Sequence, residues 1–281
     1  MPETSSLVAS LTGRISDASP WIFVGAVAFL AVWETLRPAV TVRLPGPRRW
    51  ALHFLLFLLP SLFHRLLPGI GTVALALAIR PTHRGLLHHD AIPYAVQFVL
   101  TILTLDFLDY WRHTAHHRVP LLWRVHLVHH SDREFDFTNS ARFHPFEFVL
   151  KDGVSWLAVA VMAPPPLAVV VWVVWVSVNA LFLHSNVEVP ESLARILRLA
   201  VFTPALHRIH HAQDEAAQQT NMGNLFVFWD HCFGTFQIAQ AGGRKGFEVG
   251  LKEVPPIESV RLRHVLAAPF QPDSGAGGKD R

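Results

Sequence analysis

The chain has 281 residues, of which 51% are hydrophobic and 16% are charged, and its mean hydropathy is +0.31. This charge content is low for a soluble globular protein. The formal net charge of +3 is too small and too dispersed to indicate a nucleic-acid-binding protein. A single cysteine, Cys232, excludes a disulfide framework and a paired-cysteine redox site. The apolar residues occur in long runs, which indicates a multi-pass membrane protein.

The first half of the chain predicts three apolar spans. Residues 1–20 form a polar segment without the basic start and cleavage site of a secretory signal, so the following apolar run should remain in the mature protein. That run, residues 21–36, is the first span. Residues 50–79 are apolar but contain prolines and glycines, and we expect either one kinked crossing, which we prefer, or a crossing plus a shorter interfacial helix. Residues 92–108 form the third span and lead into the first histidine-rich stretch.

The second half predicts a membrane hairpin followed by an extramembrane part. Residues 146–162 and 167–183 are two apolar arms, separated by prolines that cannot continue a helix. Two crossings return the chain to the side that it left, so a later histidine-rich stretch can meet the earlier ones. Residues 191–199 predict an amphipathic interfacial helix, and residues 268–281 predict a flexible polar tail.

Basic residues predict the orientation of these spans. By the positive-inside rule, the first short loop and the histidine-rich segments belong on the cytoplasmic side. The residues concerned are Arg37, Arg43, Arg48 and Arg49 in the loop, and Arg112, Arg118, Arg124, Arg133 and Arg142 in the segments. The expected fold is therefore all-α, with four to five transmembrane or re-entrant helices and a cytosolic histidine-rich helical cap.

Three stretches repeat the pattern H-x-x-H-H: HTAHH at 113–117, HLVHH at 126–130 and HRIHH at 207–211. On a helix these spacings place the imidazoles on one face, so they can converge on a shared point. Imidazole suits Fe, Zn, Cu and Ni, and nine or ten ligands are about right for two ions with open positions. Neither the glutamate-rich ligand set of soluble di-iron proteins nor the HExxH motif of zinc proteases occurs in these stretches. The sequence therefore predicts a two-metal site at the ends of the spans.

These stretches, in this order, resemble the membrane fatty acid hydroxylase and sterol desaturase superfamily. The resemblance also rests on HSN at 184–186, RFHPFE at 142–147, DFLDYWRH before the first box, PLLWRVHLVHHS across the second and NMGNLFVFWDHCFGTF after the last. It implies a membrane-embedded catalytic domain over residues 21–267. It also implies a centre of two iron ions, which zinc can replace in purified protein. Such an enzyme uses O2 and electrons to hydroxylate or desaturate a C–H bond of a lipid.

The resemblance also implies which residues hold the metals. The implied ligands are His113, His117, His126, His129, His130, His184, His207, His210 and His211. His116 and His144 are candidates either for ligands or for hydrogen-bonding neighbours. A ligating imidazole usually donates its other N–H to an acceptor, and the candidate polar neighbours are Asp106, Asp109, Asp214, Asn221 and Asp230. Asp109 precedes His113 by four residues, about one helical turn. The sequence departs from the family at Met222, where the family commonly has tyrosine.

The expected partners are a lipid substrate, O2, the membrane and a separate electron-donor protein, because the chain has no His-Pro-Gly-Gly segment of cytochrome b5 type. No nucleic acid is expected. Two other classes remain open: a lipid hydrolase with two zinc ions, and a histidine-rich metal transporter, which would place its histidines along the spans. A loose metal-binding tail is disfavoured because the boxes lie among aromatic residues. Hydroxylation, desaturation and ether cleavage all remain open.

Overall fold

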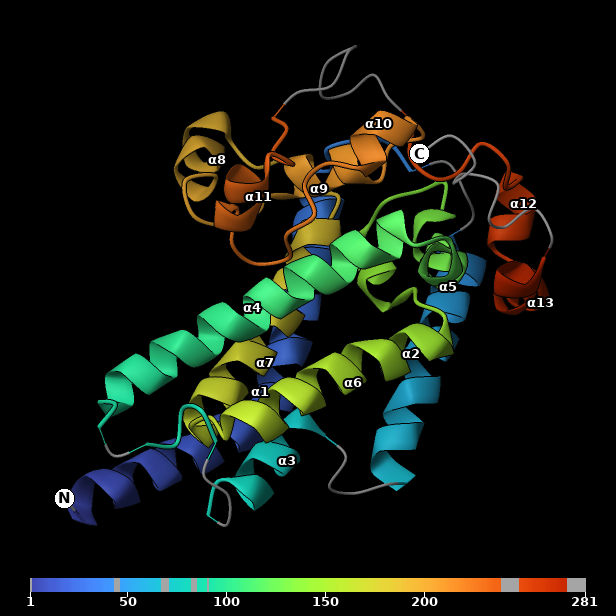
Figure 1. Cartoon of the computed structure of the whole chain (residues 1–281). Coiled ribbons are helices and arrows are strands. Elements are labelled where there is room, and N and C mark those ends of the chain that lie inside the picture. Colours follow the sequence, from blue (N-terminus) through green and yellow to red (C-terminus); the bar gives the residue numbers. More distant parts are fainter. Residues whose placement is uncertain are drawn as a thin grey trace.

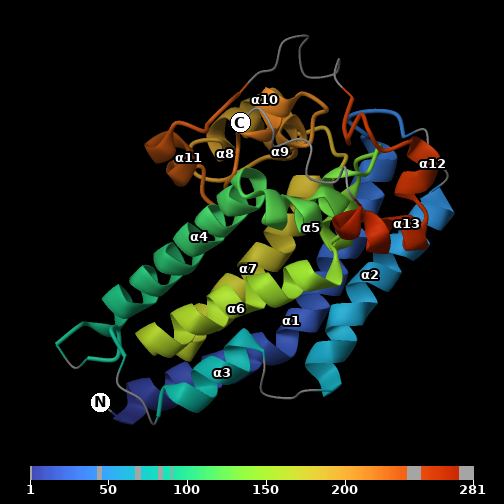
Figure 2. The ribbon, with the colours of Figure 1, turned by 45° about the vertical axis from the view of Figure 1, so that its right-hand side comes forward.

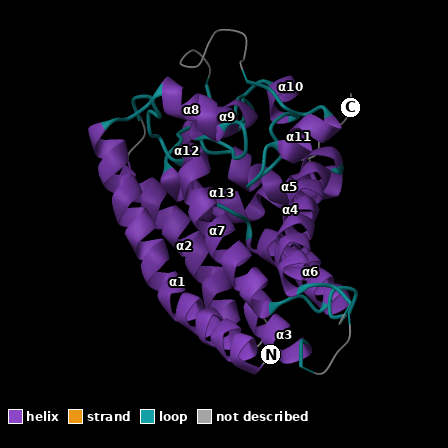
Figure 3. Cartoon of the chain, turned by 90° about the vertical axis from the view of Figure 1, so that its left-hand side faces the viewer, coloured by secondary structure: helices purple, strands orange, loops and turns teal. Residues whose placement is uncertain are grey.

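The computed structural model describes residues 2–42, 46–66, 71–81, 85–89, 91–238 and 248–271. Arg43 and residues 272–281 of the predicted tail lie outside the described residues. Figure 3 shows helices joined by loops, and within the described ranges the extended pairings are isolated bridges rather than strands. The prediction of an all-α fold is confirmed for this part of the chain.

Five long helices form a bundle (Figure 1). They are α1 (Pro2–Leu36), α2 (Gly46–Leu66), α4 (Tyr94–Arg118), α6 (Pro145–Met162) and α7 (Pro166–His184). The short helix α3 (Thr72–Ile79) packs against α6 and α7 at the end of the bundle where the N-terminus lies (Figure 2). Helix α7 contacts α1, α3 and α4, so it forms the centre of the bundle. Its Trp172 is buried with Leu105 of α4 and Met162 of α6.

Prolines set the turns that bring the histidine boxes to one end of this bundle. Pro120 and Pro166 each occupy the first turn of a helix, where the missing N–H costs nothing. Helix α4 is therefore followed at once by α5 (Pro120–His130). The hairpin between α6 and α7 turns at Ala163, whose φ of 44° is left-handed, and continues through the prolines that predicted it.

Short helices form a cap over the other end of the bundle (Figures 1 and 2). Besides α5, they are η1 (Phe137–Ala141), α8 (Glu191–Leu197), α9 (Pro204–His210), α10 (Glu215–Gln218), α11 (Phe228–Phe233), α12 (Pro256–Ser259), α13 (Leu262–Ala267) and η2 (Ala268–Phe270). Helix α9 packs on the end of α7, and η1 packs on α1, α2 and α7. The last described residues are part of this cap, since Ala268 and Pro269 are buried beside α5.

Two described helices are long and apolar enough to cross a membrane, residues Ser6–Leu36 and Pro166–His184. The other predicted spans are helical over most of their length, but α4 and α6 carry several charged residues at their cap-side ends. The apolar stretch 50–79 contains two separate helices, α2 and α3, and α3 is too short to cross a membrane by itself. The number of crossings therefore stays a prediction.

Some of the arginines from which the orientation of the spans was predicted are buried, so that use of them was wrong. Arg49 and Arg142 are fully buried, and the side chain of Arg112 is nearly so. Arg49 bonds Asp132 at 2.8 Å and Asn139 at 2.7 Å, and it also pairs with Asp136. These guanidinium groups form ion pairs and hydrogen bonds inside the protein. They therefore do not indicate which end of the bundle lies on the cytoplasmic side of the membrane. Arg118 and Arg48 are exposed and keep that significance.

Candidate metal centre

Nine histidines converge where the bundle meets the cap. The last two turns of α4 present His113 and His117, which are four residues apart and therefore share one face. The other seven come from α5, the end of α7 and α9 with the residue after it: His126, His129, His130, His184, His207, His210 and His211. All nine are buried. The structure thus brings together every histidine that the sequence predicted as a ligand.

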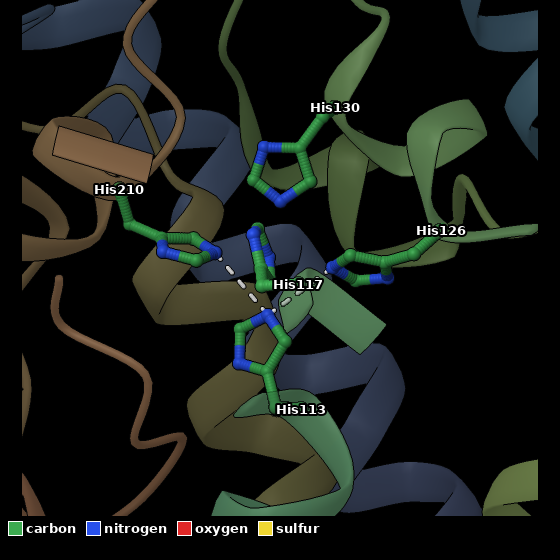
Figure 4. Close-up of side chains that lie close together, drawn as sticks. All are labelled: His113, His117, His126, His130 and His210. Carbon is green, nitrogen blue, oxygen red and sulfur yellow. Dashed lines mark hydrogen bonds between the residues drawn. The ribbon is translucent and has the colours of Figure 1, made fainter. Parts of the chain in front are cut away.

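They form two groups. The five-histidine group is His113, His117, His126, His130 and His210, and the four-histidine group is His129, His184, His207 and His211. Within each group, one ring nitrogen per residue lies within 4.8 Å of the others. Figure 4 shows the five rings of the first group directed at a common centre. The two groups adjoin, because the rings of His130 and His211 stack at 4.2 Å between centroids.

Backbone carbonyls fix the protonation of several rings. The Nδ1 atom of His113 lies 2.7 Å from the Met222 carbonyl oxygen, and that of His210 lies 2.8 Å from the Thr220 oxygen. In the other group, Nδ1 of His129 and of His184 lie 3.2 and 2.7 Å from carbonyl oxygens of Arg142 and Ala180. A carbonyl oxygen only accepts, so each Nδ1 carries the proton and each Nε2 presents a lone pair.

These lone pairs face one another. The Nε2 atoms of His113 and His210 are 3.2 Å apart, and those of His129 and His184 are 3.1 Å apart. Two acceptors at this distance repel each other unless a cation lies between them. Two nitrogens that each lie about 2.1 Å from one ion at a right angle stand about 3 Å apart. The donor set therefore fits a metal ion in each group.

His130 supports the same conclusion. It is fully buried, and neither of its ring nitrogens has a hydrogen-bond partner within the described ranges. A buried polar group without a partner costs free energy. A metal ion bound at one of these nitrogens would remove part of that cost.

Burial also keeps the rings neutral, which is the form that binds metal. It lowers the pKa of His113, His129 and His130 well below the usual value, and neighbouring rings lower each of them further. Burial likewise lowers the pKa of His210 to about 4, and burial with the Arg112 charge lowers that of His116 to about 4.

These shifts predict how the stability of the metal-free protein depends on pH. The folded pKa of His116 and of His210 lies below the ordinary value of 6.5, so below pH 6.5 the unfolded chain binds protons that the folded chain does not. The unfolding free energy should be highest above pH 6.5 and should fall as the pH is lowered toward 4. Chemical denaturation of metal-free protein at a series of pH values measures this. An unfolding free energy that stays constant down to about pH 5 would contradict the buried, neutral rings.

Glu147 is a member of the site that the sequence did not predict, although it lies in the RFHPFE stretch. Its Oε1 lies 2.7 Å from Nδ1 of His126, and both side chains are buried. Arg112 lies 3.8 Å from the same carboxylate and bonds Asp109 at 2.7 Å. The carboxylate therefore orients His126 and leaves its Nε2, 3.2 Å from that of His113, directed into the five-histidine group.

Replacing Glu147 with alanine should weaken metal binding about 10- to 100-fold, because His126 loses the acceptor that holds its ring. Glu147→Gln is the matched control: its side-chain oxygen still accepts from Nδ1, so it should lose less. Metal titration of the metal-free variants separates the two effects. Equal metal affinity in wild type and Glu147→Ala would rule out this orienting role.

The other candidates lie outside the two groups. His116 turns its Nδ1 to the Arg112 carbonyl oxygen at 2.7 Å, and His144 caps the start of α6 by accepting from the Phe146 N–H. Asp106 accepts from the Trp229 indole at 2.8 Å, and Asp214 caps α10. Within the described ranges, neither Asp106 nor Asp214 bonds a histidine of the two groups, and Asp109 instead bonds Arg112 and Asn224.

Asp230 and Asn221 act one step away from the histidines. Asp230 accepts the N–H groups of Met222 and Gly223 at 2.6 and 2.8 Å, which fixes the loop whose carbonyl holds His113. Asn221 adopts a left-handed φ of 55°, which asparagine tolerates well, and bonds the Leu206 carbonyl beside His207. Position 222 contributes its backbone carbonyl to His113, and this contact does not depend on which side chain stands there.

A cavity of about 990 Å³ reaches both groups. His113 and His126 line it from the first group, and His129, His184 and His207 line it from the second. Its apolar wall comes from α1, α2 and α7 and includes Phe23, Val27, Phe54, Phe57, Val176 and Leu181. The site can thus hold an apolar molecule next to the clustered imidazoles.

The region that carries the histidine boxes is similar to known proteins. Residues 98–235, which include all nine histidines, match the family described as fatty acid hydroxylase. The chain is 34% identical over 148 residues to the ornithine lipid hydroxylase OlsE of Rhizobium tropici, over 52% of this chain and 44% of that protein. It is 28% identical over 169 residues to the alkylglycerol monooxygenase of Homo sapiens, and the match covers 59% of this chain and 36% of that protein.

It is also 29% identical over 202 residues to the very-long-chain aldehyde decarbonylase GL1-1 of Oryza sativa subsp. indica, over 66% of this chain and 30% of that protein. The chain spans less than half the length of these relatives. No solved structure matches the chain significantly.

Proposed function

This chain belongs to the fatty acid hydroxylase family, and from that premise we propose that it is a membrane-bound oxidoreductase that uses O2 and electrons to hydroxylate or desaturate a lipid C–H bond. The nine grouped histidines would hold two iron ions. The histidine end of the bundle would lie on the cytoplasmic face, where a separate protein would supply the electrons.

The observation that carries the proposal is the position of both histidine groups at one end of an apolar cavity. A path for metal ions has no need of an apolar chamber this large beside its ligands, whereas a lipid hydrolase would need one, so a requirement for O2 and reductant is what separates the hydrolase from the oxidoreductase. A transporter would also place its ligands along the spans, whereas these lie at helix ends and in the cap. Iron bound there would supply the redox chemistry that O2 needs.

The chain's own residues bind and orient. Phe23, Val27 and Leu181 line the wall that would receive a lipid tail and exclude water. Glu147 and the carbonyl groups of Met222, Thr220 and Arg142 hold the imidazole rings. In hydroxylation, one oxygen atom enters the C–H bond and the other leaves as water, which consumes two electrons and two protons. In desaturation, the substrate loses two hydrogens, and with two electrons and two protons from the donor side both oxygen atoms leave as water.

For the substrate, we propose an amphipathic lipid with a long acyl or alkyl tail. Two of the relatives named above are, by name, an ornithine lipid hydroxylase and an alkylglycerol monooxygenase, so these two lipid classes are the first to compare. The cavity accommodates an apolar tail, but its wall also contains polar side chains, including Lys151 of α6 and Ser177 of α7. A polar head near the metals and a tail along the apolar wall would suit both kinds of surface.

Lipid profiling of cells with and without the protein tests the function. We expect a lipid that gains one oxygen or loses two hydrogens, and we expect its formation by purified protein to require both O2 and a reductant. His211→Ala is the inactive control. Lipid products that form equally well without O2 and reductant would favour the alternative of a zinc-dependent hydrolase and refute the proposal.

A further inference from the structure

Helices α1 and α2 enclose the outer part of the cavity without packing tightly on each other. Figures 2 and 3 show them running side by side along one side of the bundle. Helix α1 packs mainly on α7 and η1, whereas α2 packs mainly on η1 and α6. Residues of both helices line the cavity, and several of these, such as Val24 and Phe54, are 56% and 64% exposed. The cavity therefore opens sideways between α1 and α2.

One pair of aromatic rings crosses this opening. Phe23 of α1 and Phe57 of α2 both line the cavity, and their rings stack with centroids 6.1 Å apart and planes within 5°. Phe57 remains 38% exposed, so its outer surface is available to lipid. Phe29 and Trp33 of α1 form a second ring contact. Neither of these two residues lines the cavity, and their contact does not involve α2.

The position of this pair along α1 can be related to the histidines. Glu34 accepts the backbone N–H groups of Phe137 and Asn186 at 2.8 and 2.6 Å, so this end of α1 lies at the level of His184. Phe23 precedes Glu34 by eleven residues, which corresponds to about 16 Å along the helix axis. The pair therefore stands about that far along α1 from the level of His184, on the side where a lipid tail would extend.

We propose that the gap between α1 and α2 is the lateral entrance for the lipid tail, and that the Phe23–Phe57 pair sets how much tail beyond the oxidised carbon the enzyme accepts. This inference rests on the proposed function, since it names the route and tail length of the same substrate. Tails that end before the rings fit within the cavity. Longer tails must separate the rings to reach the bilayer, and lose the stacking contact.

The first test is photolabelling of the full-length protein in phosphatidylcholine nanodiscs. The probe is palmitic acid with a diazirine at the tail end, and an excess of ordinary palmitic acid reveals specific sites by competition. We expect competable labelling of α1 and α2 at Val24, Val27 and Phe54, and labelling of the outward-facing Phe29 that competition does not reduce. Competable labelling confined to α4 or α6 would overturn the entrance.

The second test compares tail-length profiles of the oxidised lipids made in cells by wild type, the Phe23→Ala/Phe57→Ala double variant and the Phe29→Ala control. The double variant should raise the ratio of eicosyl to dodecyl products about two- to twelvefold, because long tails no longer have to break the ring-stacking contact. Phe29→Ala should match wild type. Identical profiles in all three would overturn the role of the ring pair.

The two hypotheses fail in different ways. Wild-type protein that oxidises no lipid contradicts the proposed function, while the photolabelling still decides whether tails enter between α1 and α2. Phe57→Leu provides a milder change if the double variant accumulates poorly. It should shift the profile in the same direction, and an unchanged profile in that variant would count against the inference.

Discussion

Replacing His130 with alanine is expected to abolish lipid oxidation and to remove metal from the purified protein. His130 is fully buried, its ring nitrogens have no other partner in the described chain, and its ring stacks on His211 at the junction of the two groups. Its loss therefore damages the five-histidine group directly and removes a packing surface of the four-histidine group. Turnover should fall to background, and metal per chain should fall by at least about half.

His116→Ala is the matched control for this experiment. His116 is also buried and lies next to His117, but it belongs to neither group and bonds the Arg112 carbonyl oxygen instead. This variant should keep its metal and most of its activity. Membrane insertion should be unchanged in both variants. An active His130→Ala enzyme with full metal content would refute the assignment of His130 as a ligand.

Replacing Arg49 with alanine should destabilise the protein by about 3–5 kcal/mol, because it leaves buried carboxylates without their counter-charge. Asp132 and Asp136 both pair with Arg49, and Asn139 accepts a third hydrogen bond from it. Burial would raise the pKa of Asp132, but Arg49 holds it well below its usual range. Without Arg49, these carboxylates must take up protons or draw water into the interior.

The neighbouring Arg48 provides the control, since it is exposed and Arg48→Ala should change stability by less than about 0.5 kcal/mol. Unfolding of both variants by denaturant in detergent, followed by tryptophan fluorescence, gives the comparison. Arg49→Lys should lie between them because lysine keeps the charge but not the planar fork. Similar stabilities for Arg48→Ala and Arg49→Ala would show that the buried ion pairs contribute little.

The convergence of the histidine boxes was largely predictable from the sequence, because spacing within a helix determines which side chains share a face, whereas the individual ligands were implied by the family resemblance. His113 with His117 illustrates this. The division into two groups was not predictable, since His129 and His130 are adjacent in sequence but point to different groups. That division depends on how α5, α7 and α9 approach one another in space.

The supporting residues were harder to predict, for the same reason. Asp109 lies one turn from His113, yet its carboxylate turns to Arg112 and Asn224. Glu147 is 21 residues from His126 in sequence, and the packing of α6 near α5 makes it the partner. Arg49 was a poor indicator of membrane orientation for a related reason. The sequence alone cannot distinguish an exposed arginine from one that is buried between two aspartates.

The positions of the long apolar helices were predictable from the sequence, because each corresponds to a long run of hydrophobic residues. The hairpin of α6 and α7 follows its predicted arms closely, with the prolines at the turn. The cap was predictable only as a region, since helices as short as α10 and α12 have too few residues to show a periodic pattern. Their positions depend on tertiary contacts and individual caps, such as Asp214.

We propose that the two histidine groups each hold a transition-metal ion that the oxidation requires. Elemental analysis of purified, active protein, carried out together with turnover measurements on the same samples, tests it most directly. We predict two iron ions per chain, one for each group, with activity that rises in proportion to iron content. Full activity in protein that contains far less than one metal ion per chain would contradict the claim.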